Sequence, residues 1–380
     1  MRLAAHVGLG VGAAVATFLV AAVLLRQAKR QAEPPAPLAE EAIDPAVWGK
    51  RFPAQFEAYR RPAAEDCRWR EKRGHAFSLK DRDETTPDDD PRWPRLFAGL
   101  QKPRPVPGGC LECHAATGFH GAESYYVARL RLERPVACVD CHDPRTMHLR
   151  ATRGGAKRDG SPQEMRSLVC AQCHVEYYFA PGGKLVLNPG IKVEQIEAYY
   201  DAINFSDWTH PATGAPLLRA QHPQYEMWSQ GIHARSGVAC ADCHMPYMRQ
   251  GAIKISDHHV RSPLENVERA CLPCHAFPAE EMKARAKLIQ DRNAALLSRA
   301  LDALVALIDE IQAARAAGVT DQKLEPARKL HRKAQWRADF VSADHSKGFH
   351  APQESARILS EAIDFARQGQ LSAARAQVTP

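Results

Sequence analysis

The chain has 380 residues, eleven cysteines and a formal net charge of +7 at pH 7. Ten of the cysteines lie in five copies of one pattern, Cys-x-x-Cys-His, at residues 110–114, 138–142, 170–174, 240–244 and 271–275. This use of cysteine excludes a disulfide framework. Cys67 alone stands outside the pattern, and we interpret it as an incidental or buried thiol.

The chain begins with an apolar segment, Val7 to Leu25, which contains no charged residue. As a helix rising about 1.5 Å per residue, it just spans the core of a bilayer. Arg26, Lys29 and Arg30 stand where a cleavage site would have to follow. Residues 1–30 therefore favour an uncleaved membrane anchor over a cleaved signal peptide, although this basic flank opposes the positive-inside rule.

Residues 31–46 are polar and proline-rich, which predicts a tether. Residues 47–278 carry all five patterns with no linker between them, so we expect one compact region. The aromatic residues between Trp48 and Arg61 are expected to pack on it. The stretch from Asp81 to Gly109 is rich in proline and charge, which predicts an irregular loop.

Residues 279–380 differ in kind, because apolar residues recur there at helical spacing. We predict a long helix over Ala279–Ala317 that ends at Gly318, a second from about Asp321 to Ala343, and a third from Pro352 to about Arg367. The fold class is mainly α, with little β structure, a core packed around haem and long C-terminal helices in the same compact domain. The first helix is longer than one core needs, so part of its apolar stripe is available to a partner chain.

The repeated pattern has a chemical cause. Two thiols spaced Cys-x-x-Cys add to the vinyl groups of one haem, and the histidine that follows becomes an axial ligand of the iron. Zinc or disulfide bonding does not explain a histidine after every second cysteine. The sequence therefore predicts five c-type haems, bound by Cys110, Cys113, Cys138, Cys141, Cys170, Cys173, Cys240, Cys243, Cys271 and Cys274. Their proximal ligands are His114, His142, His174, His244 and His275.

Haem attachment also bears on location and partners. Haems of the c type are attached outside the cytoplasmic membrane, so most of the chain is expected on the periplasmic side of the bacterial inner membrane. The propionates of five haems bring about ten carboxylate charges, which arginine side chains bind well. These charges outweigh the formal +7, so the basic excess does not predict nucleic-acid binding.

Further motifs resemble one family, the ammonia-forming cytochrome c nitrite reductases. The matching stretches are residues 170–179, Phe205–Trp208, Ala220–Trp228, Gly231–His233, Cys240–Pro246, Arg73–Phe77, Ser256–His258 and Gly348–Pro352. The resemblance covers about residues 70 to 352 in the family's order. It implies six-electron reduction of nitrite to ammonium.

The resemblance implies distal iron ligands for four haems. His75 would pair with His174, and His258 with His142. His350 would pair with His244, and His233 with His275. The haem of Cys110 and Cys113 would keep an open face for substrate. Many family members have lysine where this chain has His114, a variant that the family also contains.

Three residues would surround the substrate at the open haem. The resemblance places Tyr177 and His222 there, together with an arginine for which Arg95 is our choice and Arg92 and Arg104 are alternatives. It also implies a calcium ion nearby, held by Glu176, Tyr177, Arg219 and Gln221. Arg219 stands where lysine is usual, so either its carbonyl binds the ion or its guanidinium replaces it.

Two other functions remain open. An electron-transfer cytochrome without catalysis would need a fifth distal histidine on the Cys110 haem, and His120 and His148 are the nearby spare candidates. A related reductase would use the same open haem on hydroxylamine or sulfite. The resemblance further implies a homodimer formed through the C-terminal helices and a membrane quinol-oxidising cytochrome c as electron donor.

Overall fold

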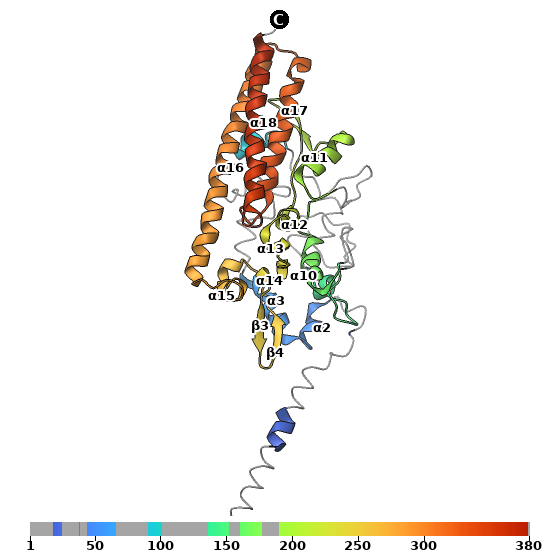
Figure 1. Cartoon of the computed structure of the whole chain (residues 1–380). Helices are drawn as coiled ribbons and strands as arrows, with labels where there is room; N and C mark the ends of the chain where they lie inside the picture. Colours follow the sequence, from blue (N-terminus) through green and yellow to red (C-terminus); the bar gives the residue numbers. More distant parts are fainter. Residues whose placement is uncertain are drawn as a thin grey trace, which may run out of the picture.

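A computed structural model describes residues 18–24, 38, 44–65, 90–100, 136–151, 160–176 and 190–378 of the chain. In the range 44–65, side chains are described only as far as residue 61. The described part is mainly helical, as the sequence predicted (Figure 1). Val7–Leu25 is described only over residues 18–24, which are helical. Among the described residues, no helix has the length and apolar character needed to cross a membrane.

Three long helices form a bundle at the C-terminal end of the molecule: α16 (Ala279–Ala316), α17 (Asp321–Ala343) and α18 (Pro352–Val378) (Figure 1). The first two match the predicted bounds closely. Gly318 ends the first because its φ of +85° is a left-handed conformation that glycine adopts at low cost. Thr320 begins the second, since its hydroxyl accepts from the N–H of Lys323.

The third helix continues well past the predicted end at Arg367. Its buried residues Ala366, Gly369 and Ala373 keep one small-residue face turned inward beyond that point. A side chain at Gly369 would place its Cβ only 2.8 Å from a methyl group of Leu307 in α16, so glycine permits the two helices to approach closely. The predicted bound was wrong because this small-residue face lacks the large apolar side chains that a periodic pattern detects.

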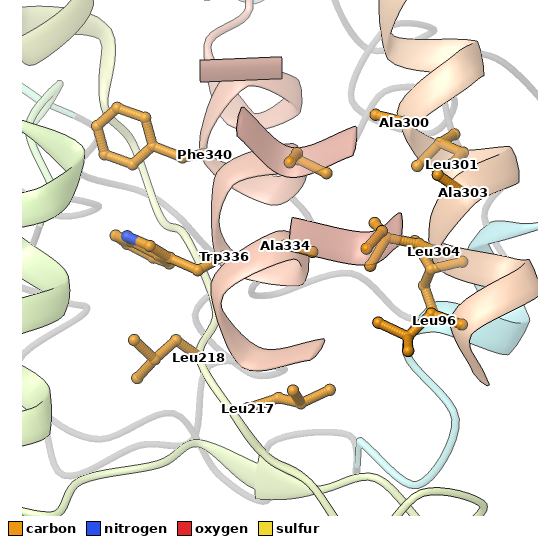
Figure 2. Close-up of a cluster of buried hydrophobic side chains, with 14 of the residues drawn as sticks. Leu96, Leu217, Leu218, Ala300, Leu301, Ala303, Leu304, Ala334, Trp336 and Phe340 are labelled. Carbon is orange, nitrogen blue, oxygen red and sulfur yellow. The ribbon is translucent and has the colours of Figure 1, made fainter. Parts of the chain in front are cut away.

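The main apolar core lies between these helices and the segments beside them (Figure 2). Trp336 and Phe340 of α17 are fully buried, with ring centroids 5.4 Å apart. The indole N–H of Trp336 donates to the carbonyl of Val193 at 3.0 Å, at the start of α11 (Val193–Ala202). Burying each large side chain contributes about 1.5–3 kcal/mol, so this core holds α11 and the segments after it against the bundle.

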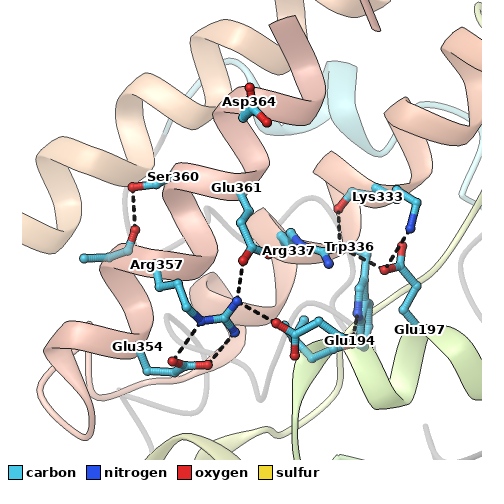
Figure 3. A network of polar contacts seen from close by, with 12 residues as sticks. Glu194, Glu197, Lys333, Trp336, Arg337, Glu354, Arg357, Ser360, Glu361 and Asp364 are labelled. Carbon is cyan, nitrogen blue, oxygen red and sulfur yellow. Dashed lines mark hydrogen bonds and ion pairs between the residues drawn. The ribbon is translucent and has the colours of Figure 1, made fainter. Parts of the chain in front are cut away.

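A network of charged side chains joins α11, α17 and α18 (Figure 3). Arg337 of α17 bonds Glu197 of α11 at 3.0 Å and Glu361 of α18 at 2.8 Å. Arg357 of α18 bonds Glu194 of α11 at 2.6 Å. Because Arg337 and Glu197 are almost fully buried, losing either partner would leave an uncompensated charge inside the protein.

Strands are few in the described part, as expected. Antiparallel pairs form between β1 (Trp208–Thr209) and β2 (Pro216–Leu217), and between β3 (Tyr247–Gln250) and β4 (Ile253–Ser256). In the second pair Tyr247 lies opposite Ser256. This hairpin brings the chain from the fourth Cys-x-x-Cys-His motif back toward His258.

Near the N-terminus, α2 (Pro45–Gly49) and α3 (Pro53–Glu65) pack beside the second motif. Trp48 is buried, and its ring centroid lies 6.3 Å from that of His142. The hydroxyl of Tyr59 donates to the carbonyl of Val136 at 2.7 Å. The prediction that the aromatic residues of this segment pack on the haem-motif region is confirmed. Of the irregular loop predicted from Asp81 to Gly109, residues 90–100 are described, and they include the helical turn α6 (Trp93–Leu96).

The core contains a buried histidine that generates the first prediction. Burial, followed by the nearby His210, lowers the pKa of His331 to about 3. The imidazole of the unfolded chain binds a proton near pH 6.5, whereas the buried imidazole of the folded protein does not. The free energy of unfolding therefore decreases as pH falls from about 6.5 to about 3. Asn at position 331 would retain an acceptor for the hydroxyl of Thr213. The substitution His331→Asn should therefore remove a slope of up to about 1.4 kcal/mol per pH unit from the plot of the free energy of unfolding against pH.

Denaturant unfolding of the wild type and of His331→Asn between pH 4.5 and 6.5 measures the free energy of unfolding of each protein at each pH. The control is His148→Asn, because His148 is exposed and should keep the wild-type slope. If the free energies of unfolding of wild type and His331→Asn differed by the same amount at every pH, the prediction would be contradicted.

Candidate functional site

The four Cys-x-x-Cys-His motifs in the described part share one local structure. Each forms a helical turn, in α9 (Cys138–Cys141), at the end of α10 (Pro162–Ala171), in α14 (Cys240–His244) and after α15 (Val267–Ala270). The N–H of His142, His174 and His275 donates to the carbonyl of the first cysteine at 2.9, 2.9 and 3.0 Å. Because residues three apart in a helical turn lie on one face, both sulfurs of each motif are presented to the same side.

The structure brings His142 and His258 together. Their ring centroids lie 6.1 Å apart with planes inclined by 25°. A metal–imidazole bond of about 2 Å places each centroid about 3 Å from the metal, so two ligands on opposite sides of one ion are about 6 Å apart. The Nδ1 of His142 bonds the carbonyl of Met147 and that of His258 bonds the carbonyl of Ser256, at 3.1 and 2.9 Å. Both Nε2 atoms are therefore suited to ligate one iron, since a ligating histidine usually donates its other N–H.

A second pair has the same spacing. The ring centroids of His233 and His275 lie 6.2 Å apart with planes inclined by 84°. His233 lies in the short helix α13 (Ile232–Arg235) and also stacks on Phe349 at 5.9 Å. These two imidazoles likewise fit the two faces of one haem.

In the third predicted pair, His244 and His350 are both partly buried, and each imidazole is oriented by a hydrogen bond at Nδ1. Burial and then the neighbouring His350 lower the pKa of His244. The Nδ1 of His244 bonds the carbonyl of Arg261 at 3.0 Å. The Nδ1 of His350 bonds the buried carboxylate of Asp344 at 2.9 Å; burial lowers the pKa of His350, but Asp344 more than offsets this and raises it. A carboxylate behind a ligating imidazole strengthens the ligand.

The third and fourth motifs lie next to each other. Ser167 of α10 accepts from the N–H of Cys240 at 3.1 Å through its hydroxyl. Arg166 and Gln163, also in α10, bond the carboxylate of Asp242 in α14 at 2.9 and 2.6 Å. Two haems held by these motifs are therefore kept close together by direct contacts between their own helices.

The loop after the third motif is bonded to the segment that carries His222. The N–H of Tyr225 donates to the carbonyl of His174 at 3.0 Å. The N–H of Gln221 donates to the carboxylate of Glu176 at 2.7 Å, and the N–H of Glu176 donates to that of Glu226 at 3.0 Å. His222 is buried within this arrangement, directly before α12 (Gln224–Ser229). The structure thus brings the predicted residues Glu176, Gln221 and His222 together.

Three buried carboxylates, on Glu176, Glu226 and Asp339, and the partly buried carboxylate of Asp207 surround this region. The guanidinium of Arg219 bonds Asp339 at 2.5 Å and stacks over the ring of Phe97 at 4.2 Å. Asp207 accepts from the backbone N–H of Arg219, and Asp339 from that of Ala220, both at 2.8 Å. The carboxylates thus hold the backbone of residues 219–221 in place.

Burial raises the pKa of these acids, to about 7 for Asp207 and about 8 for Glu226, and well above the usual range for Glu176. Removing several carboxylates from water costs free energy unless positive charge compensates them. One oxygen of Glu176, Oε1, has no hydrogen-bond partner among the residues that the structure describes. Among the described residues no group of three or more acidic, histidine or cysteine side chains is arranged to hold a metal ion, so a hard cation such as calcium would need amide or carbonyl oxygens beside this carboxylate.

The arginine candidates lie at α6. Arg95 pairs with Asp309 of α16, and Arg92 pairs with Asp90 and Asp302. The carbonyl of Arg95 also accepts a hydrogen bond from His210 at 2.8 Å. The structure therefore directs these two guanidinium groups toward acids, and the predicted catalytic role of Arg95 stays a prediction.

Several predicted site residues fall outside the described part. They are His75, Arg104, Cys110, Cys113, His114, His120 and Tyr177. His148 is exposed in the structure.

Helical Cys-x-x-Cys-His turns combined with imidazole pairs at the spacing of two ligands on one metal define a multihaem c-type cytochrome. Comparison with known proteins agrees: the sequence pattern of the Cytochrome c552 family matches residues 64–379. The chain belongs to the cytochrome c552 family. The family resemblance seen in the sequence motifs is confirmed.

Related proteins show the extent of the similarity. Cytochrome c-552 of Bacteroides fragilis strain YCH46 is 37% identical over 375 residues, covering 86% of this chain and 76% of that protein. Cytochrome c-552 of Parabacteroides distasonis is 38% identical over 327 residues, covering 80% and 65%. Among solved structures, the cytochrome c nitrite reductase of Desulfovibrio desulfuricans, whose catalytic subunit has two calcium sites, superposes with a TM-score of 0.74 at 26% identity. That match covers 90% of this chain and 88% of the other.

Sequence reasoning missed three residues of the site, namely Asp207, Glu226 and Asp339. Asp207 and Glu226 lie inside motifs that carried the family resemblance, but no role was assigned to them. Their signal was an acidic residue flanked by aromatic ones, in Phe-Ser-Asp-Trp and Tyr-Glu-Met-Trp. Asp339 lies in α17, where only the fold brings it to Arg219.

The second prediction distinguishes two adjacent histidines. His258 faces His142, whereas the N–H of the next residue, His259, bonds the carboxylate of Asp257 at 3.0 Å. Replacing His258 with Met should change the near-infrared band of one low-spin haem, because one axial nitrogen is exchanged for sulfur. His259→Ala is the matched control and should leave the spectrum unchanged. The reverse result would assign the ligand to His259.

Proposed function

We propose that this protein reduces nitrite to ammonium. The nitrogen passes from +3 to −3, so each turnover consumes six electrons and eight protons at one site. Such a reaction requires an open metal site, groups that supply protons, and further redox centres that deliver electrons repeatedly. The five sequence motifs and the family to which the chain belongs support this combination.

One observation carries the proposal: His222 is buried on a segment bonded to the loop that follows the third motif. Two of the distal histidines in the described part, His258 and His233, already face motif histidines. His222 is not assigned to an iron, and the family resemblance places it beside the substrate of the open haem. A pure electron carrier would instead need a distal ligand on the Cys110 haem, and His148, one of the two candidates, is exposed.

The residues around the substrate would have separate tasks. Cys110, Cys113 and His114 would hold the open haem, which would supply a reducible iron site for nitrite. His222 would hydrogen-bond a nitrite oxygen and stabilise the charge that develops as the N–O bonds break. Tyr177 and His222 are also suited to deliver protons. An arginine, for which Arg95 is our choice, would hold the other oxygen.

The remaining motifs would supply electrons. In the described part, His142 with His258 and His233 with His275 have the spacing of ligands on the two faces of one haem, and His244 with His350 would form a third such pair. His75 would close a fourth haem on the side opposite His174. The same open site suits hydroxylamine or sulfite, which differ from nitrite in the oxygens that His222 and the arginine would contact.

Calcium is the cation that we propose for the acidic site. Glu176 would bind it through Oε1, Gln221 through its side-chain amide oxygen, and Tyr177 and Arg219 through their carbonyls. The guanidinium of Arg219 bonds Asp339, so it compensates that carboxylate and leaves the charge of Glu176 for the ion. The match to a nitrite reductase with calcium sites supports this assignment.

The third prediction concerns this ion. Elemental analysis of the purified protein should find one calcium per chain, and chelation should lower both the unfolding temperature and nitrite turnover, because it leaves Glu176 uncompensated. Glu176→Gln should abolish calcium binding, whereas Glu197→Gln, at another buried carboxylate in α11, should retain it. Absence of calcium together with an unchanged melting curve in chelator would mean that Arg219 supplies the positive charge.

Partners and location complete the proposal. Over the first half of α16, from Ala279 to Leu296, Ala286 is the one buried residue and Leu288 is 49% exposed. This half would form a homodimer interface burying on the order of 1,200–2,000 Å². The chain would lie on the periplasmic side of the inner membrane, anchored by residues 1–30, and receive electrons from a membrane quinol-oxidising cytochrome c.

The fourth prediction tests the reaction itself. Protein carrying all its haems and supplied with a reduced viologen dye should convert nitrite to ammonium in a one-to-one ratio. His222→Asn should lower turnover at least tenfold with unchanged haem content, on the scale that acid–base groups contribute. A protein that consumes no nitrite, or a variant that retains full turnover, would contradict the proposal.

A further inference from the structure

Glu226 occupies a central position between two segments that the proposed function brings to one substrate. It lies in the first turn of α12, four residues after His222, and is 1% exposed. Its Oε1 accepts the backbone N–H of Glu176 at 3.0 Å. Glu176 directly precedes Tyr177, the other group expected at the substrate.

The bond from Glu226 is one of a reciprocal set. Glu176 itself accepts the N–H of Gln221 at 2.7 Å, and the N–H of Tyr225 donates to the carbonyl of His174 at 3.0 Å. Each segment therefore both donates to the other and accepts from it. Two segments joined by three hydrogen bonds in this way cannot slide past each other without breaking all three.

Retaining a carboxylate at this depth is costly, because transferring such a group out of water is unfavourable unless its oxygens are satisfied. An apolar side chain would fill the same space without that cost. The bond to the N–H of Glu176 is the contact that this group makes with the third motif, and its second oxygen, Oε2, has no hydrogen-bond partner among the described residues.

We propose that Glu226 is a positioning residue for nitrite reduction: it fixes the backbone at Glu176, and thereby holds the end of the third motif in place against the segment that carries His222. This inference rests on the proposed function, because it assigns Tyr177 and His222 to the substrate. Glu226 itself does not touch nitrite. A displacement of about 1 Å in one of the two groups is enough to slow such a reaction by up to a hundredfold.

The test compares Glu226→Met with Glu226→Gln in the full haem-loaded protein. Met has similar volume but no acceptor for the N–H of Glu176, so it should lower kcat for nitrite at least tenfold and weaken nitrite binding to the ferric protein at least fivefold. Gln keeps an acceptor oxygen and should restore both values to within about threefold of wild type. Haem content and the low-spin spectrum should stay unchanged in both.

Glu197→Met is the control for loss of a buried carboxylate elsewhere, and should lower stability while leaving kcat unchanged. If Glu226→Met fails to incorporate haem, Glu226→Asp, whose shorter side chain withdraws the acceptor, should show an intermediate loss of kcat. Wild-type kcat and nitrite affinity in Glu226→Met, or equal losses in Met and Gln, would overturn the inference. A wild-type protein that binds nitrite but forms no ammonium would overturn the proposed function alone, because the binding titration needs no turnover.

Discussion

Two imidazoles can ligate one haem iron only if they face it from opposite sides, because the porphyrin nitrogens take the other four positions, and their ring centroids are then about 6 Å apart. The fold meets this constraint between residues far apart in the chain, as in the pairs His142 with His258 and His233 with His275. The β3–β4 hairpin and the packing of α13 therefore have a functional purpose, since each places a histidine opposite a motif. The large apolar core lies mainly in the C-terminal bundle and the segments packed on it, which provides a rigid support for these loops.

The same bundle supports the acidic site. Asp339 of α17 bonds both the side chain of Arg219 and the N–H of Ala220, so the segment leading to His222 is attached directly to a long helix. Glu226 then connects this segment to the loop after the third motif. Several buried carboxylates in one place are costly for stability, and natural proteins keep such costs where geometry matters for function. This explains why the acids cluster at the one region that the function requires to be rigid.

Much of this organisation follows from local sequence. The cysteine spacing specifies the haem turns, and the bounds of α17 follow from Thr320 and from helical periodicity. The length of α18 was underestimated because its small residues pack by close approach rather than by large apolar area. The bond between Glu226 and Glu176 and the pair of Arg219 with Asp339 join residues 50 and 120 positions apart. No local pattern records such contacts, which depend on how the bundle and the loops pack.

In the function that we propose, the histidines close every haem but one. Low-temperature electron paramagnetic resonance of the fully oxidised protein, with spin quantitation, measures this directly, because haems with two imidazole ligands are low-spin and an open haem is high-spin. The account predicts four low-spin haems and one high-spin haem per chain, the latter changing when nitrite is added. Five low-spin haems with no response to nitrite would contradict it and identify the protein as an electron carrier.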